Sequence, residues 1–515
     1  MATVALGSKA GKWIMVSSIM ASAMAFIDST ALNVVLPSLQ KSLNASGTDL
    51  FWILNAYLLM LAALILIGGS LGDRLGRKKV FMAGIFIFIL GSAACGFAPS
   101  VTLLVVFRML QGIGGALMIP GSLSLISSSI NPKERGKAIG TWSAFTTVVT
   151  MGGPILGGAF GDAGLWRYIF FINIPIGVAA LFILAREVKE IKDEDGVQGL
   201  DFAGAIAIAL GLAALTFGFL RIPAVGLNNW QVYSSLGGGL FLLLVFLIIE
   251  KKSKYPMMPL QLFSNLTFSG ANLLTFFLYA GLGAGMLFLG LNMVQVQGYS
   301  QLQSGLTFLP FTVLMITLAR FAGAQADKHG PRLLLICGPA IAGAGLLILS
   351  FVKQTAGPAD YWTTFFPGIL VFGLGMSLTV APLTTAVMGS VSDHFSGTAS
   401  GVNNALTRIA SVFANAILGA LAVLFFSGAL QGELKNIKLD SKQKQVIEKQ
   451  SINLGNAKVP EGFEGKDKAV IEKAYKESFI SAFGKIMQIS AFSGFLGALM
   501  AVFFIKNSAV KKGKE

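Results

Sequence analysis

Apolar runs of membrane-spanning length repeat along almost the whole chain. A bilayer core requires about 20 apolar residues per helix, and about fourteen runs reach that length. Their approximate limits are 13–36, 50–71, 80–98, 101–125, 137–160, 166–185, 202–220, 231–250, 268–291, 303–325, 333–352, 362–388, 397–426 and 480–505. With a mean hydropathy of +0.73, the chain carries more apolar surface than a soluble domain of this size could bury. The sequence therefore predicts an all-α, polytopic membrane protein with about fourteen transmembrane helices.

Basic residues are distributed unequally between the two predicted sides of the membrane. If the N-terminus is cytoplasmic, the inner loops and the tail carry roughly five times as many Lys and Arg residues as the short outer loops. Those outer loops have only Lys41, Arg167, Arg221 and Lys353. Because an even number of spans returns the chain to the same side, we expect both termini in the cytoplasm. The short termini favour a bacterial plasma (inner) membrane.

Other classes of function find little support in the sequence. The net charge of +15 would suit nucleic acid only if the basic residues clustered on one folded face, but they lie in short loops. Cys95 and Cys337 lie within apolar runs, and His329 and His394 lie in polar loops, so neither a disulfide framework nor a metal site is expected. A Gly-x-x-x-x-Gly-Lys-Ser/Thr phosphate loop is missing from the sequence. We expect no enzymatic activity, no ATP, no cofactor and no nucleic-acid partner.

A basic, glycine-containing turn occurs twice and suggests an internal repeat. Residues 69–79 join the second run to the third, and a weaker copy at 323–332 follows the tenth. Many transporters are built from such repeated halves. Matching the copies predicts an N-terminal six-helix bundle (1–188), an inserted helix pair with linkers (189–265), a C-terminal six-helix bundle (266–426 and 480–515) and an extracytoplasmic loop (427–479).

The loop at 427–479 is long, polar and rich in lysine and glutamate. Its charges are mixed, as in Lys442, Lys444, Glu448 and Lys449. Long loops do not count in the charge rule for orientation. We expect one or two exposed helices here, forming a solvated cap.

Four short motifs mark the first five runs. The basic turn contains Gly69, Asp73, Arg74, Gly76 and Arg77. The first run contains Asp28 to Pro37, the fourth contains Arg108 to Ala116, and the fifth contains Gly153, Pro154, Gly157 and Gly158. With these motifs the chain resembles a major facilitator superfamily transporter of the fourteen-span drug:proton antiporter family, the multidrug and antiseptic efflux type. Val149 stands where the family's span-five pattern has a glycine.

This resemblance implies both a fold and a function. The fold is two six-helix bundles plus two inserted helices, present as a monomer in contact with membrane lipid. The function is export of small amphiphilic drugs or toxins in exchange for protons, by alternating access and without a cofactor. Export of a specific metabolite, lipid or antibiotic is an alternative, and uncoupled facilitation is another.

Asp28 and Arg108 are charged residues within predicted spans. A charged side chain in hydrocarbon costs about 3 kcal/mol or more. Asp28 lies about nine residues, near 13 Å, from the outer end of its span, and Arg108 about seven residues, near 10 Å. Their similar depth predicts an ion pair that separates during transport and couples protonation of Asp28 to motion, the role that the resemblance also implies. The alternative is a fixed pair that only holds two spans together.

Polar and small residues form stripes on two spans. Arg108, Gln111, Gly112 and Gly115 share one face of span four, which lines either a cavity or a close helix contact. Asn404 and Arg408 lie on one face of span thirteen, with Asn403 beside them. We expect these side chains either to contact substrate or to form structural hydrogen bonds. The candidate cavity residues are Asn33, Asn55, Gln111, Gly115, Asn403, Asn404 and Arg408. Because these positions hold no further acid, we expect neutral, monocationic or anionic amphiphiles rather than dications.

The remaining motif residues are candidates for a conformational switch. The resemblance implies that Asp73 pairs across the cytoplasmic side and holds the outward-facing state closed there. The alternative is that the basic turn only prevents this loop from crossing the membrane. The switch candidates are Gly69, Asp73, Arg74, Gly76, Arg77, Gly153, Pro154, Gly157 and Gly158.

Overall fold

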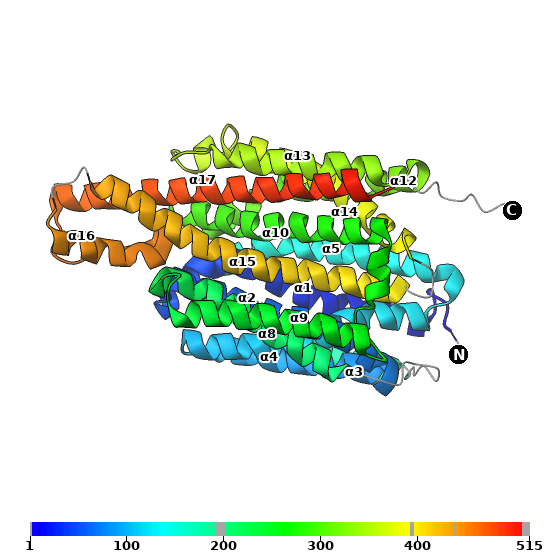
Figure 1. Ribbon diagram of the computed structural model, residues 1–515. Helices are drawn as coiled ribbons and strands as arrows, with labels where there is room; N and C mark the ends of the chain where they lie inside the picture. The colour runs from blue at the N-terminus through cyan, green and yellow to red at the C-terminus, as the bar shows by residue number, and fades with distance from the viewer. Residues whose placement is uncertain (1–2, 189, 191–200, 392–395, 436–438, 507–515) are drawn as a thin grey trace.

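The computed structural model describes residues 3–188, 190, 201–391, 396–435 and 439–506. This part of the chain is folded almost entirely into α-helices (Figure 1), and its β-pairing is limited to an isolated bridge between Val4 and Ile130. Thirteen of the described helices are long and apolar enough to cross a membrane. The prediction of an all-α, polytopic membrane protein is therefore confirmed.

The N-terminal part of the chain follows the first six predicted spans. It is built from α1 (Lys9–Leu43), α2 (Gly47–Leu75), α3 (Arg77–Phe97), α4 (Val101–Ser129), α5 (Pro132–Asp162), α6 (Tyr168–Phe171) and α7 (Asn173–Glu187). The sixth predicted span is thus divided into the short α6 and the longer α7. Helix α5 has 31 residues and occupies the position of the fifth predicted span, although only part of its side chains is described.

The rest of the chain follows the other predicted spans, with short helices between them. The inserted pair is α8 (Phe202–Val225) and α9 (Trp230–Lys252). After it come η1 (Leu260–Ser264), α10 (Leu266–Gln295), α11 (Gln301–Leu306), α12 (Leu309–His329), α13 (Arg332–Ser350), η2 (Pro358–Asp360), α14 (Phe365–Gly389), α15 (Ser396–Leu434), α16 (Ser441–Glu448), η4 (Lys449–Asn456) and α17 (Gly465–Phe504).

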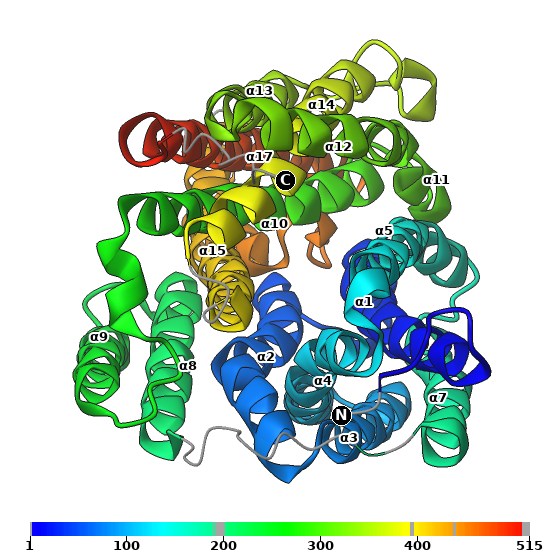
Figure 2. The same ribbon diagram turned by 90° about the vertical axis from the view of Figure 1, so that its right-hand side faces the viewer.

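Two groups of helices lie side by side, with the inserted pair on one flank. Seen along the helices, α1 to α5 and α7 form one group, and α10 to α15 together with α17 form the other (Figure 2). Helices α8 and α9 pack on each other, and α8 reaches both α2 and α15. The domain limits expected from the repeat stay a prediction.

Glycines allow equivalent helices of the two groups to cross closely. In the first group, a Cβ at Gly84 of α3 would lie 2.8 Å from the backbone nitrogen of Met118 on α4. In the second group, a Cβ at Gly368 of α14 would lie 2.5 Å from the Leu349 side chain on α13. Small residues at helix crossings let backbones approach, which is how membrane helices associate without a hydrophobic driving force.

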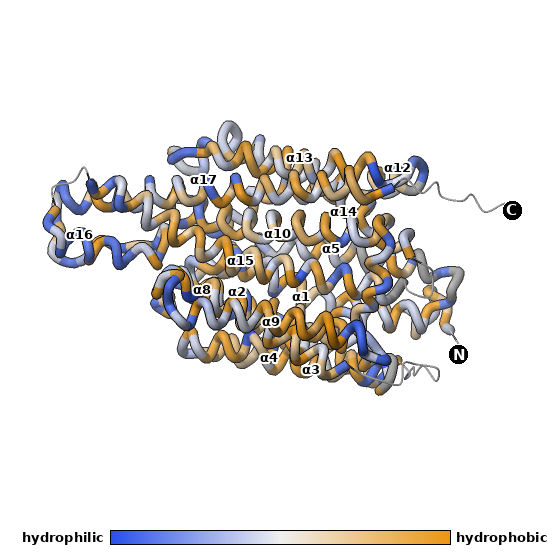
Figure 3. Tube along the Cα trace, in the orientation of Figure 1, coloured by the Kyte–Doolittle hydropathy of each residue, from blue (hydrophilic) through white to orange (hydrophobic). Residues whose placement is uncertain are grey.

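The two ends of the bundle differ in character. Apolar residues fill the middle of the helices and polar residues gather at both ends (Figure 3). We call one end the hairpin end, because the turn between α2 and α3 at Gly76 lies there, along with the start of α1 and the end of α17 (Figure 1). We call the other the cap end, because α16 and η4 lie beyond it.

The cap is solvated only in part, with an exposed helix α16 as expected and a buried portion that was not expected. The cap segment, residues 439–464, includes the exposed Lys442 on α16, but Ile447 and Leu454 are buried in the main hydrophobic core. Helix η4 packs against α2, α10, α15 and α17. A Cβ at Gly47, the first residue of α2, would lie 2.5 Å from the Ile452 carbonyl oxygen. A segment that is polar overall thus buries two of its apolar residues across the end of the bundle.

Candidate functional site

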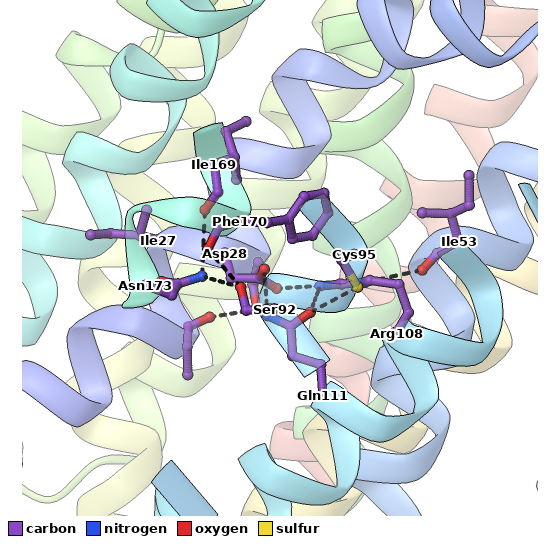
Figure 4. Close-up of polar contacts among 12 residues, drawn as sticks. Ile27, Asp28, Ile53, Ser92, Cys95, Arg108, Gln111, Ile169, Phe170 and Asn173 are labelled. Atoms are coloured by element: carbon purple, nitrogen blue, oxygen red, sulfur yellow. Dashed lines mark hydrogen bonds and ion pairs between the residues drawn. The ribbon is translucent and has the colours of Figure 1, made fainter. Parts of the chain in front are cut away.

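A buried ion pair joins α1 to α4 (Figure 4). Arg108 Nη1 donates to Asp28 Oδ2 at 2.5 Å, and the two side chains are only 1% and 0% exposed. Gln111 Nε2 donates to Asp28 Oδ1 at 2.9 Å. Arg108 Nη1 also donates to Gln111 Oε1 at 2.7 Å. Both carboxylate oxygens of Asp28 are therefore engaged by donors from α4.

Helical geometry explains why α4 supplies both donors. Arg108 and Gln111 are three residues apart, so they lie on the same face of α4. That face meets α1 at Asp28. The structure contains the expected ion pair, whereas the coupling role of the pair stays a prediction. Gln111, which we expected to line a cavity, instead hydrogen-bonds both members of the pair.

Further groups surround the arginine and were not expected from the sequence. Arg108 Nε donates to the Ile53 carbonyl oxygen at 3.4 Å, and its guanidinium lies 4.4 Å from the centre of the Tyr57 ring. The Cys95 thiol donates to Gln111 Oε1 at 3.8 Å. A guanidinium over an aromatic face is a favourable cation–π contact. No sequence signal marks Tyr57 or Cys95, because aromatic and thiol side chains are ordinary residues of buried helices.

The glycines of span four make close helix contacts. A Cβ at Gly112 would lie 2.5 Å from the Tyr57 carbonyl oxygen, and one at Gly115 would lie 3.2 Å from the Tyr57 hydroxyl. Of the two interpretations left open for this stripe, the structure therefore shows close packing of α4 on α2. Gly115 does not line open space.

The predicted cavity residues on α1 and α2 lie in different surroundings. Asn33 is half-buried on α1, where its carbonyl oxygen would lie 3.9 Å from a Cβ at Gly290 of α10. Asn55 on α2 is fully buried, and neither its amide nitrogen nor its amide oxygen has a hydrogen-bond partner. An unpaired buried amide costs about 1–3 kcal/mol, which makes Asn55 a candidate contact for a ligand.

The three predicted cavity residues on α15 differ in their hydrogen bonding. Asn403 Nδ2 donates to Asn272 Oδ1 at 3.0 Å and to Thr275 Oγ1 at 2.7 Å, so it joins α15 to α10. Asn404 is exposed and donates to the Ser400 carbonyl oxygen of its own helix at 3.0 Å. Arg408 is half-buried, and its Nε is buried without a hydrogen-bond partner. These residues do not contact Asp28.

The basic turn holds a carboxylate from a distant segment. Gly76 has a φ of +108°, a backbone conformation that favours glycine. The first residues of α3 follow, and the backbone N–H groups of Lys78 and Lys79 donate to Glu190 Oε1 and Oε2 at 3.1 and 3.2 Å. Free N–H groups at a helix N-terminus favour such an anion.

Other residues of this turn lie against α4. Arg77 Nη1 donates to the Ser124 carbonyl oxygen at 3.4 Å, and a Cβ at Gly69 would lie 4.0 Å from Pro120. The side chains of Asp73 and Arg74 lie outside the described residues, so their expected role stays a prediction.

The span-five motif lies where α5 meets both α1 and the second helix group. Gly153 and Gly157 face Thr30 and Ala31 of α1, respectively. A Cβ at Gly158 would lie 2.5 Å from the carbonyl oxygen of Gln301, the first residue of α11. The Pro154 carbonyl faces Gly305 of α11. These small residues thus permit close contact between the two groups at the cap end.

Polar contacts between the two groups reinforce this closure. Asp162 Oδ1 and Oδ2 accept from the backbone N–H groups of Gln301 and Leu302 at 2.7 and 2.9 Å. The Gln301 side chain donates to Ser38 Oγ at 2.5 Å. Gln295 Nε2 donates to Gln40 Oε1 at 2.9 Å. The sequence did not mark these residues, because single polar residues near helix ends are common.

A half-buried phenol, Tyr361, supports α11 from outside the predicted spans. The Tyr361 hydroxyl donates to the Thr307 carbonyl oxygen at 2.8 Å. Burial, together with the nearby Tyr299 hydroxyl, raises the pKa of Tyr361 to about 12. The donor proton is therefore retained across the physiological pH range.

Known proteins are similar to this chain in sequence and in architecture. The family model for the Major Facilitator Superfamily matches residues 19–415. The chain is 31% identical to the multidrug resistance protein Stp of Mycobacterium tuberculosis over 443 residues, which is 85% of this chain and 81% of that protein. It is 28% identical to the tetracenomycin C resistance and export protein of Streptomyces glaucescens, over 96% of this chain and 91% of that protein.

A further relative is similar to this chain in sequence, and two solved structures are similar to it in fold. The multidrug transporter protein MdtP of Bacillus subtilis is 31% identical over 77% of this chain and 72% of its own length. An inward-facing, unoccupied bacterial homolog of the lysosomal transporter Spinster matches 98% of this chain and 100% of its own, with a TM-score of 0.66 at 18% identity. The inward-open xylose transporter XylE of E. coli covers 97% of both chains with a TM-score of 0.57 at 14% identity. The chain therefore belongs to the Major Facilitator Superfamily, and its relatives within that family include multidrug resistance transporters.

Proposed function

We propose that this transporter exports small amphiphilic drugs or toxins in exchange for protons, by alternating access. The single observation that carries the proposal is the Asp28–Arg108–Gln111 cluster, a buried carboxylate held by two donors from one neighbouring helix. Multidrug resistance proteins among the relatives support the substrate class. The proton gradient rather than ATP supplies the energy in this proposal, and the protein acts as a monomer.

The cluster offers a direct way for a proton to act on helix packing. Protonation of Asp28 removes the negative charge to which Arg108 and Gln111 are bound. It also puts a hydrogen on a carboxylate oxygen that, in the ionised state, only accepts hydrogen bonds. The attraction between α1 and α4 is then weaker in the protonated state than in the ionised state. A ligand shifts a conformational equilibrium by its difference in affinity for the two states, and a proton on Asp28 has such a difference.

The contacts at the cap end identify the helices that must separate during transport. For a substrate to leave at the cap end, α11 must separate from α1 and α5, which breaks the bonds of Gln301 to Asp162 and Ser38. We propose that the hairpin end faces the cytoplasm of a bacterial plasma membrane. In this orientation the described conformation is closed to the outside, in keeping with the inward-facing structures of similar fold.

The proposal is tested with ethidium in everted membrane vesicles energised by a proton gradient. Asp28→Asn should reduce gradient-driven ethidium uptake more than about tenfold, because the asparagine cannot ionise. Ethidium exchange without a gradient should persist in this variant, which separates lost coupling from a misfolded protein. The matched control is Glu477→Gln, which alters an exposed carboxylate on α17. Full gradient-driven uptake by Asp28→Asn, or insensitivity of the wild type to a protonophore, would contradict proton coupling and favour a facilitator.

A second candidate is a dedicated exporter of one antibiotic. The similarity to a tetracenomycin C resistance and export protein over nearly the whole chain favours it. A susceptibility panel in an efflux-deficient host distinguishes the two candidates. Resistance to several unrelated compounds supports the multidrug proposal, and resistance to one antibiotic alone supports the second.

A further inference from the structure

Arg408 is a membrane-embedded cation without a counter-ion among the residues that the structure describes. The ion pairs of this part of the chain are Lys9–Glu187, Arg108–Asp28, Arg186–Glu187 and Lys473–Glu477. Arg408 takes part in none of them, and its Nε is buried without a hydrogen-bond partner. The carboxylate of Asp28 does not compensate it, because both oxygens of Asp28 are engaged by donors from α4.

Arg408 lies between the two helix groups rather than toward lipid. Helix α15 runs beside α2, with Gly401 next to Leu66 and Gly419 next to Phe51. Arg408 lies between these points, about 10 Å along the helix from Gly401 at 1.5 Å per residue. Ala405, one turn earlier on the same helix, is buried in a core cluster with residues of α1, α2 and α4. The arginine is therefore placed deep in the bundle.

Two phenols and an unpaired amide lie on the helices that face Arg408. Tyr57 lies on α2 and Tyr279 on α10, and both of these helices pack against α15. Asn55, two residues before Tyr57, is fully buried with both amide atoms unpartnered. This surrounding offers hydrogen-bond donors and aromatic surface but no acidic group within ion-pair distance among the described residues.

An arginine at this depth requires a partner. A guanidinium stays charged in proteins and presents a planar fork that matches carboxylate-like oxygens. A charge in hydrocarbon costs about 3 kcal/mol or more, and residues that carry that cost commonly mark substrate pathways. We infer that Arg408 binds the anionic group of a transported amphiphile, a carboxylate, sulfonate or phenolate attached to an aromatic or aliphatic body. The inference rests on the proposed function, and it assigns Arg408 to the anionic members of the expected neutral, monocationic and anionic amphiphiles.

The test uses two probes that share one aromatic frame. 8-Anilinonaphthalene-1-sulfonate carries a sulfonate, and N-phenyl-1-naphthylamine is its neutral counterpart. Binding of each to the purified full-length protein is measured by fluorescence for the wild type, Arg408→Gln and Arg408→Lys. Arg408→Gln should lower the affinity for the sulfonate about tenfold or more, because a charge-assisted hydrogen bond is lost. Its affinity for the neutral probe should change less than about twofold by the same argument. Arg408→Lys should retain part of the sulfonate preference.

Controls separate this inference from general binding and from the proposed function. Arg320→Gln, which alters an exposed arginine of α12, should leave both affinities unchanged. Equal loss of both probes in Arg408→Gln, or unchanged binding of the sulfonate, would overturn the inference. Displacement of the sulfonate by an equal concentration of methanesulfonate would show a small-anion site and would also overturn it. Failure of proton-driven ethidium transport would instead count against the proposed function, because the binding experiment does not depend on a gradient.

Discussion

Arg108 and Arg408, two arginines within membrane-spanning helices of this transporter, have opposite surroundings. Arg108 donates to a carboxylate, an amide and a backbone carbonyl, and its guanidinium lies over the ring of Tyr57. Arg408, on a helix of the other group, has a buried Nε without a partner. The first arginine is satisfied by the protein itself, and the second leaves its charge available to a ligand.

This difference suggests a division of labour between the two helix groups. A satisfied ion pair responds to the arrival or loss of a proton, because either event changes the number of charges in the pair. An unsatisfied cation responds to the arrival of an anion. Helix α2 contacts the surroundings of both arginines, because its Tyr57 lies under the guanidinium of Arg108 and the helix also packs against α15, which carries Arg408.

Replacing Arg108 with methionine should have the largest effect on stability. Arg108→Met leaves Asp28 and Gln111 without their shared donor, and removal of one partner of a buried pair costs about 3–5 kcal/mol. We expect a marked drop in the thermal unfolding midpoint of the detergent-purified protein. The double variant Asp28→Asn/Arg108→Met should be less destabilised than Arg108→Met alone, because no carboxylate is left unpaired. Additive effects would show that the two side chains do not interact.

Changing Gln111 should have an intermediate effect. Gln111→Leu removes the donor to Asp28 Oδ1 and one acceptor of Arg108 but leaves the direct ion pair in place. A lost hydrogen bond to a charged group costs about 1.5–3 kcal/mol. The unfolding midpoint should therefore fall less than for Arg108→Met. If Gln111→Leu were as stable as the wild type while substrate binding fell, Gln111 would line the cavity, as the sequence alone had suggested.

The sequence predicted the depth of these charged residues in the membrane better than it predicted their full set of hydrogen-bond partners. The depth of Asp28 and Arg108 follows from counting residues along two helices, so their pairing could be predicted. The role of Gln111 could not, because a stripe at helical spacing looks the same whether it lines a cavity or supports an ion pair. Likewise, Asn403 and Arg408 share one helix, but only the packing of α10 against α15 decides that Asn403 is bonded to Asn272.

The helical fold was similarly predictable, and the cap segment was not. Runs of apolar residues mark membrane helices directly, since the bilayer requires about 20 of them. The burial of Leu454 depends on η4 reaching across α2 and α10, which no local pattern indicates. Composition describes a segment on average, whereas a few side chains decide where it packs.

Replacing Arg408 should have the smallest effect on stability, and this result distinguishes the two arginines most directly. Arg408→Met removes no ion pair or hydrogen bond among the described residues, and it relieves the cost of an uncompensated charge. We therefore expect a change within about 1 kcal/mol and toward greater stability. Lys473→Ala, which breaks an exposed i,i+4 pair with Glu477, provides a control for a change of about 0.3–0.5 kcal/mol. A drop in the unfolding midpoint comparable to that of Arg108→Met would mean that Arg408 has a structural partner within the protein, and its assignment to an anionic substrate would then lose its physical basis.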